Sequence, residues 1–168
     1  MNKNHLVIAV VLLLLCLSPT IYAQSIGTNT AEAVIAEALT ATAGTTLNFG
    51  ALIPSGTAGT VRIATDGSRT PSAEVTALTS TFTAATFDIT GTPNLQYSIA
   101  LPAAGTVQIT DGGGNAMDVD NWESDPATFG TLDSGGAETV NVGATLYVGA
   151  NQPSGSYSGS FSVTFNYQ

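Results

Sequence analysis

Short runs in which apolar and polar side chains alternate recur along most of the chain. A period of two residues is typical of strands that bury one face, and turn-forming residues separate the runs about every ten residues. The pattern predicts strands over residues 46–53, 60–64, 74–78, 85–90, 97–101, 106–110, 138–142, 145–148 and 156–167. This rhythm predicts an all-β fold, a single antiparallel Greek-key β-sandwich of the immunoglobulin-like type.

The clearest alternation lies at the C-terminus. Between Tyr157 and Tyr167 every second residue is aromatic, Val or Gly, and the residues between them are Ser, Thr or Asn. The run predicts the last strand of the sandwich, with its aromatic side facing the core. Gly155, the fourteenth residue from the C-terminus, precedes the run, and Tyr167 is the penultimate residue.

Residues 31–39 carry the weakest pattern. Thr30 is a suitable cap for one or two helical turns here, but alternation that places Ala33, Ile35 and Leu39 on one face favours a strand, although Glu37 falls on the same face. We therefore expect residues 24–38 to form a first strand or an N-terminal arm, followed by a β-sandwich domain over residues 39–168.

The first residues have the pattern of a signal peptide. Lys3 supplies a positive start, residues 6–17 are an unbroken apolar run, and Ala23 is a small residue suited to cleavage. We predict a signal over residues 1–23 and a mature chain that begins at Gln24. Pro19 stops the apolar run short of the roughly 20 residues that span a membrane, so we expect an exported chain with no membrane span after cleavage.

Composition then removes most function classes. The only Cys, His and Lys lie within the predicted signal, so the mature chain lacks thiol and imidazole nucleophiles, Schiff-base lysines and soft metal ligands. Two arginines against twelve Asp and Glu leave a formal charge of -10. Such a chain has no basic patch for nucleic acid or anionic lipid. We expect no enzymatic activity and no cofactor.

The only cluster of chemistry-bearing side chains is acidic. Asp118, Asp120, Glu123 and Asp125 fall within eight residues, beside the only tryptophan, Trp122. Carboxylates suit calcium and, as a pair across a cleft, glycoside hydrolysis. The spacing matches no EF-hand or RTX repeat, however. We interpret the segment as a solvated acidic loop in which Trp122 closes one end of the sandwich, and the four carboxylates stay weak calcium candidates.

Two resemblances refine this description. Gly155, the alternating positions and the penultimate Tyr167 resemble the C-terminal motif of chaperone–usher pilins. Residues 39–168 resemble domain-of-unknown-function family 4402, secreted β-sandwich proteins of Gram-negative bacteria, at 47–50, 66–70, 87–93, 97–99 and 142–152. The pilin resemblance implies an incomplete sandwich that accepts a strand from a neighbour. It implies a chaperone and subunit interface at Gly155, Tyr157, Gly159, Phe161, Val163, Phe165 and Tyr167, and a donor arm with Ala33, Ile35 and Leu39.

These expectations leave two functions open. The first is a fimbrial structural subunit that passes through the periplasm, with a chaperone, an usher and neighbouring subunits as partners, and reaches the cell surface. The second is a non-polymerising secreted or surface-attached module that binds a carbohydrate or a host surface through Trp122, Tyr147 and Tyr157. In that case residues 33–42 complete the sandwich within their own chain.

Overall fold

The computed structural model describes residues 28–168, and these residues form strands and no helix. The predicted signal, including the cleavage position between Ala23 and Gln24, lies outside the described residues. The twelve strands are β1 (Thr40–Ala43), β2 (Leu52–Pro54), β3 (Gly59–Ile63), β4 (Arg69–Pro71), β5 (Val75–Ala77), β6 (Ala85–Thr90), β7 (Gln96–Ala100), β8 (Val107–Thr110), β9 (Ala116–Asp125), β10 (Phe129–Thr131), β11 (Ala137–Val148) and β12 (Thr164–Tyr167). The all-β prediction is confirmed.

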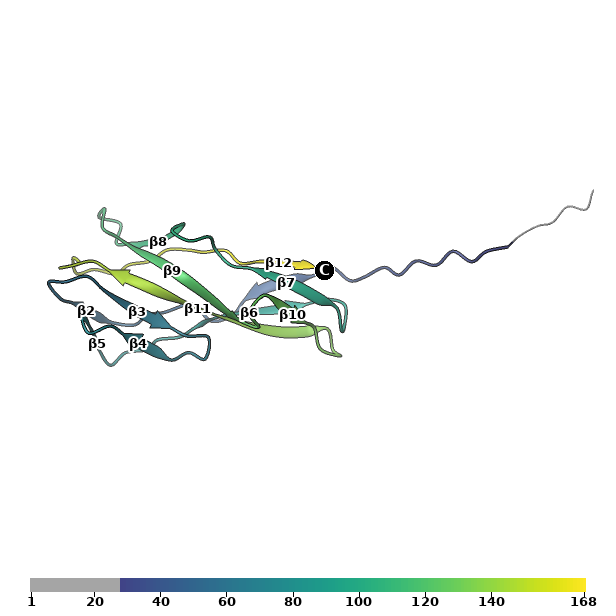
Figure 1. Cartoon of the computed structure of the whole chain (residues 1–168), viewed down its shortest axis with the longest axis horizontal. Helices are drawn as coiled ribbons and strands as arrows, with labels where there is room; N and C mark the ends of the chain where they lie inside the picture. The colour runs from purple at the N-terminus through teal and green to yellow at the C-terminus, as the bar shows by residue number, and fades with distance from the viewer. Residues whose placement is uncertain (1–27) are drawn as a thin grey trace, which may run out of the picture. The chain divides into compact units, whose positions relative to one another are not determined.

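Strand β11 organises the largest sheet (Figure 1). Along one side it pairs with β6 over residues 137–142 and then with β3 over residues 144–148. Along its other side it pairs with β9. Strands β1, β4 and β8 extend this sheet from β6, β3 and β9, all in antiparallel register. A three-stranded sheet, β10-β7-β12, and the pair β2-β5 complete the fold.

The core has two apolar clusters, and β11 contributes to both. The first cluster gathers the inward side chains of β3, β9 and the end of β11, among them Val61, Ile63, Val119 and Leu146. The second gathers side chains of β6, β7 and the start of β11, Tyr97 being the largest of those with no exposed surface. Trp122 packs against both clusters.

The interpretation of residues 116–125 as a loop was wrong. They form β9, which pairs with β8 and with β11. Met117 and Val119 point into the core while Asp118 stays exposed, which is the alternation of a half-buried strand. At Asn121 the backbone turns left-handed, with a φ of 50°, and the pairing with β11 shifts register nearby, so Trp122 faces the core.

Three other strand predictions needed correction. The predicted break at residues 143–144 does not occur, and β11 is continuous there. Gly143 allows this because it has no Cβ that would collide with the Ile63 carbonyl. Residues 46–53 form a strand only from Leu52, because Gly50 turns the chain with a φ of 76°. Residues 31–39 form neither a strand nor a helix, and pairing with β6 begins only at Thr40.

The C-terminal run keeps its predicted alternation of exposure but not continuous pairing. Its aromatic and valine side chains are half-buried and its Ser, Thr and Asn side chains are exposed. The backbone pairs with β8 only at Ser158 and then with β7 from Thr164 onward. Five residues between these points, 159–163, belong to no strand. The last strand is therefore shorter than the sequence predicts.

Candidate functional site

A groove of about 1000 Å³ opens onto the first core cluster. One wall is segment 46–54, and the other is segment 151–161, which includes Gly155. Between them the floor is formed by core side chains of β8, β9 and β11, namely Val107, Ile109, Met117, Val119, Trp122, Leu146 and Val148. We call this feature the apolar groove, because its floor consists of hydrophobic side chains.

Both walls are hydrogen-bonded on one side only. Asn48 exchanges two backbone hydrogen bonds with Thr83, and Ser158 exchanges two with Thr110. In an antiparallel strand the neighbouring residues direct their N–H and C=O groups the opposite way. Within the described part of the chain the backbone groups of Leu47, Tyr157 and Gly159 have no hydrogen-bond partner. Each wall thus presents an unpaired backbone edge beside an isolated bridge, at Asn48 and at Ser158.

Arg69 holds the first wall in place. Its Nη1 donates to the Phe49 carbonyl at 3.0 Å and its Nη2 donates to the Leu78 carbonyl at 2.7 Å. The guanidinium also lies 4.4 Å from the ring centroid of Phe82. No motif in the sequence singles out this residue. One indication of its importance is present in the sequence: Arg69 is one of only two arginines in the predicted mature chain, and it directly follows a turn.

A tyrosine holds the second wall. The Tyr157 hydroxyl donates to the Pro153 carbonyl at 2.8 Å and accepts from Gln152 Nε2 at 3.0 Å. Gly159 is required here because a Cβ would collide with the carbonyl of Gln108 on β8. Gly155 has no such constraint: its nearest contact is an ordinary 3.4 Å. Nothing in the fold of the isolated chain therefore explains glycine at position 155.

The predicted C-terminal interface residues separate into two groups. Gly155, Tyr157, Gly159 and Phe161 line the apolar groove, where the Phe161 ring lies 4.5 Å from Trp122. Val163, Phe165 and Tyr167 pack instead against the second core cluster. Phe165 lies 6.0 Å from Tyr97, between ring centroids, and the Tyr167 hydroxyl accepts a 2.7 Å hydrogen bond from the backbone of Thr92.

The predicted arm residues differ in burial. Ile35 is 95% exposed, its neighbour Val34 is 96% exposed, and Ala33 is exposed as well. Leu39 is half-buried against the second core cluster, and the backbone N–H of Glu37 donates to the Thr92 hydroxyl at 2.6 Å. The chain divides into two units between Val34 and Ile35, and the sandwich belongs to the second unit.

The acidic candidates do not converge. Asp118 accepts from the Gln108 side chain, Asp120 accepts from the backbone of Gly105, and Glu123 pairs with Arg62. This guanidinium lowers the pKa of the Glu123 carboxyl. Asp125 is exposed at the end of β9. Residues 28–168 contain no group of three acidic, His or Cys side chains arranged for a metal ion.

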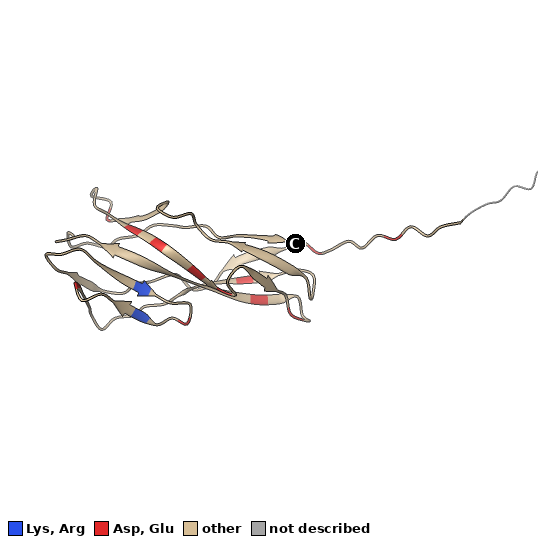
Figure 2. Ribbon diagram, viewed as in Figure 1, with Lys and Arg blue, Asp and Glu red and all other residues tan. Residues whose placement is uncertain are grey.

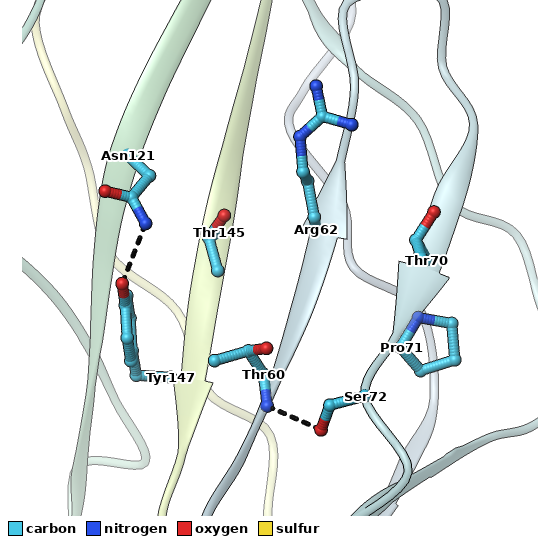
Figure 3. Close-up of a pocket in the computed structure, with 8 residues that line it drawn as sticks. All are labelled: Thr60, Arg62, Thr70, Pro71, Ser72, Asn121, Thr145 and Tyr147. Carbon is cyan, nitrogen blue, oxygen red and sulfur yellow. Dashed lines mark hydrogen bonds between the residues drawn. The ribbon is translucent and has the colours of Figure 1, made fainter.

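A second hollow lies on the opposite face of the large sheet, because Thr145 and Tyr147 alternate along β11 with Leu146 and Val148 of the groove floor. Figure 3 shows the residues that line it. We call it the outer-face depression. It has a volume of about 410 Å³ and is lined by Thr60, Arg62, Thr70, Pro71, Ser72, Asn121, Thr145 and Tyr147. Figure 2 places the two arginines of residues 28–168 on the neighbouring strands β3 and β4, and shows a row of acidic residues along β9.

The three aromatic side chains predicted for a binding face do not share one. Tyr147 is 41% exposed and lines the outer-face depression, whereas Trp122 and Tyr157 are half-buried and line the apolar groove. No helix within the described residues is long and apolar enough to cross a membrane.

Comparison with known proteins identifies the domain. Residues 39–167 match the family described as a domain of unknown function, DUF4402. The chain belongs to this family. The match covers the sandwich from Leu39, the first residue packed on the second core cluster, to Tyr167. No curated protein and no solved structure matches the chain. Membership of DUF4402 therefore assigns the domain and leaves its activity to be inferred from the site.

Proposed function

We propose that this DUF4402 protein is an exported structural subunit of a surface fibre, assembled by β-strand complementation. The observation that supports this proposal is the apolar groove with an unpaired backbone edge on each wall. An inserted strand adds backbone hydrogen bonds along both edges and buries alternate side chains on the apolar floor. Each fully buried Val or Ile side chain contributes about 1.5–3 kcal/mol. Such exchange between identical chains is head-to-tail and open-ended.

The register of β1 favours a strand from a neighbouring chain. To line the first wall as a hairpin, the N-terminal arm has to reverse over residues 39–45. These residues are committed elsewhere: Thr40–Ala43 pair with β6, and Leu39 packs against the second core cluster. Insertion into the chain's own groove requires loss of that pairing. Insertion into another copy leaves it intact.

The proposed donor lies upstream of Glu37, where the side chains of Ala33 and Ile35 are exposed. Leu39, predicted as a third donor position, packs against the second core cluster of its own chain. The C-terminal edge from Gly155 to Phe161 is the proposed surface for a periplasmic chaperone, which would cover the groove until a neighbour replaces it. This role supplies a reason for glycine at position 155, where the fold itself requires none.

The test compares two neighbouring arm variants of the exported chain. Ile35→Asp changes the proposed inserted face, and Val34→Asp is its matched control, because the two side chains are equally exposed and face opposite ways in a strand. Mass in solution and unboiled gels measure assembly. We expect ladders from the wild type and Val34→Asp, and monomers from Ile35→Asp. If ladders disappear only in Val34→Asp, the arm still donates a strand, but the opposite face of that strand is the inserted one.

A second experiment uses a peptide of residues 24–39. Trp122 is the only tryptophan and lies on the groove floor, so its fluorescence reports insertion into a chain that lacks residues 24–38. A wild-type chain that stays a monomer, together with an unchanged Trp122 signal, would overturn the proposal. That result would favour the non-polymerising binding module.

A further inference from the structure

The outer-face depression combines an aromatic ring with the hydroxyl groups of threonine side chains. Tyr147 is 41% exposed, and its hydroxyl accepts a 2.8 Å hydrogen bond from Asn121 Nδ2, which fixes both side chains (Figure 3). The left-handed backbone of Asn121 brings its amide to this position. Tyr147 thus retains its own O–H proton for donation, and the Asn121 carbonyl oxygen is free to accept.

Threonine hydroxyls surround this pair. Thr145 is 8% exposed, the only buried polar residue of the described chain, and it lies in the floor of the depression. Its hydroxyl, and those of Thr60 and Thr70, are not among the buried unsatisfied polar atoms of residues 28–168, so they are accessible from the depression. A ligand rich in hydroxyl groups can therefore exchange hydrogen bonds with them.

The charge of the depression is balanced locally. Arg62 donates to Glu123 through two bonds, Nε to Oε1 at 2.7 Å and Nη2 to Oε2 at 2.5 Å. This bidentate pair leaves no net charge to attract an anion, and the chain as a whole is acidic. The remaining guanidinium N–H groups still donate hydrogen bonds. The chemistry therefore fits a neutral ligand rather than a phosphate, a sulfate or an acidic sugar.

We propose that the outer-face depression binds a neutral hexose unit of a glycan. The Tyr147 ring packs against the C–H face of the sugar, and Asn121, Thr145 and Arg62 bond its hydroxyls. The volume of about 410 Å³ lies in the lower part of the range of small-ligand sites, about 300–1,000 Å³. This role is independent of strand exchange, because the apolar groove lies on the other face of the sheet.

The experiment titrates the Ile35→Asp variant of the exported chain, which is expected to stay a monomer, with cellobiose, maltose, lactose and N,N′-diacetylchitobiose, observed by two-dimensional amide NMR. We expect at least one disaccharide to shift the amides of Arg62, Asn121 and Tyr147 in a saturable way, while the amide of Tyr157, in the apolar groove, stays unchanged. A second titration with glucuronic acid tests the preference for neutral sugars. Tighter binding of the acid would overturn the charge argument and with it the proposal.

Three variants test the roles of the residues. We expect Tyr147→Ala to weaken binding at least tenfold, and Tyr147→Phe, which keeps the ring but frees Asn121, to weaken it several-fold. Phe129→Ala is the matched control, because Phe129 is a similarly exposed aromatic residue on another sheet, 49% exposed. Shifts that persist in Tyr147→Ala, or the absence of saturable shifts with all four neutral sugars, would refute the proposal.

Discussion

The contact between Gly91 and Tyr167 provides a direct test of how the penultimate aromatic residue is held. A Cβ at position 91 would overlap the Tyr167 hydroxyl, which accepts a hydrogen bond from Thr92. Gly91→Ala therefore displaces the ring and removes this bond. Overpacking costs about 1–3 kcal/mol, and the lost hydrogen bond costs about 1 kcal/mol. Together these terms predict a loss of about 2–4 kcal/mol in the free energy of unfolding.

Gly91→Ala should destabilise the protein less when residue 167 is phenylalanine and has no hydroxyl. In Tyr167→Phe the nearest atoms to the new methyl group are the ring carbon Cζ at 3.1 Å and Leu132 Cδ1 at 3.2 Å, which need to move by only a few tenths of an ångström. Alanine also lowers the conformational entropy of the unfolded chain, which stabilises the folded state by about 0.4–1 kcal/mol and offsets part of the steric cost. We expect Gly91→Ala to cost less than about 1 kcal/mol in this background.

Urea unfolding followed by Trp122 fluorescence measures all four members of this cycle. Gly155→Ala is the control, since position 155 has room for a methyl group, and it should change the free energy of unfolding by less than about 0.5 kcal/mol. Equal costs of Gly91→Ala with tyrosine or phenylalanine at position 167 would refute the steric reasoning.

Three further predictions concern Arg69, Glu123 and Tyr97. Arg69→Met should lower the free energy of unfolding by about 1–3 kcal/mol, since two carbonyls lose a charged donor. Arg62→Met should lower it by at most about 1 kcal/mol, because the ion pair of Arg62 is exposed. Urea melts that show equal losses for the two variants would contradict this prediction. Arg62 lowers the pKa of Glu123, so its stabilisation is present above about pH 4.5 and is lost as the pH falls; Glu123→Gln should flatten this part of the stability profile. Burial, then the hydrogen bond to Glu138, raises the pKa of Tyr97, so stability should fall above about pH 10 and Tyr97→Phe should reduce that fall; an unchanged alkaline profile would refute this assignment.

The sequence predicts the fold class because the strands that bury one face carry a readable period. Strand β6 was predicted at its observed bounds, and β3, β5, β7 and β8 within one residue at each end. Strand β9 was missed because its acidic outward positions suggested a loop, although Met117 and Val119 alternate with them. Strands β4 and β10, three residues each, are too short to show a period, and β10 pairs with β7, which is distant in the sequence.

The candidate site was only partly predictable. Alternation identified Tyr157 and Phe161 as inward-facing, and both line the apolar groove. It could not identify Arg69, whose role depends on carbonyl groups that are 20 and 9 residues away. Nor could it identify the outer-face depression, because Asn121 and Tyr147 meet only through the register between β9 and β11. Local pattern gives the face of a residue, whereas tertiary pairing gives its neighbours.

The contrast between pattern and pairing at the C-terminus points to an unsatisfied strand edge. The sequence alternates without a fault from Tyr157 to Tyr167, yet the backbone is paired only at Ser158 and from Thr164. Natural proteins protect exposed edges with lysine, proline or bulges, and the mature chain predicted here contains no lysine. An aromatic edge without such protection promotes aggregation of a free subunit. The same edge is protected when another chain supplies a strand, which is why the half-paired C-terminal segment and the apolar groove beside it support one assembly mechanism.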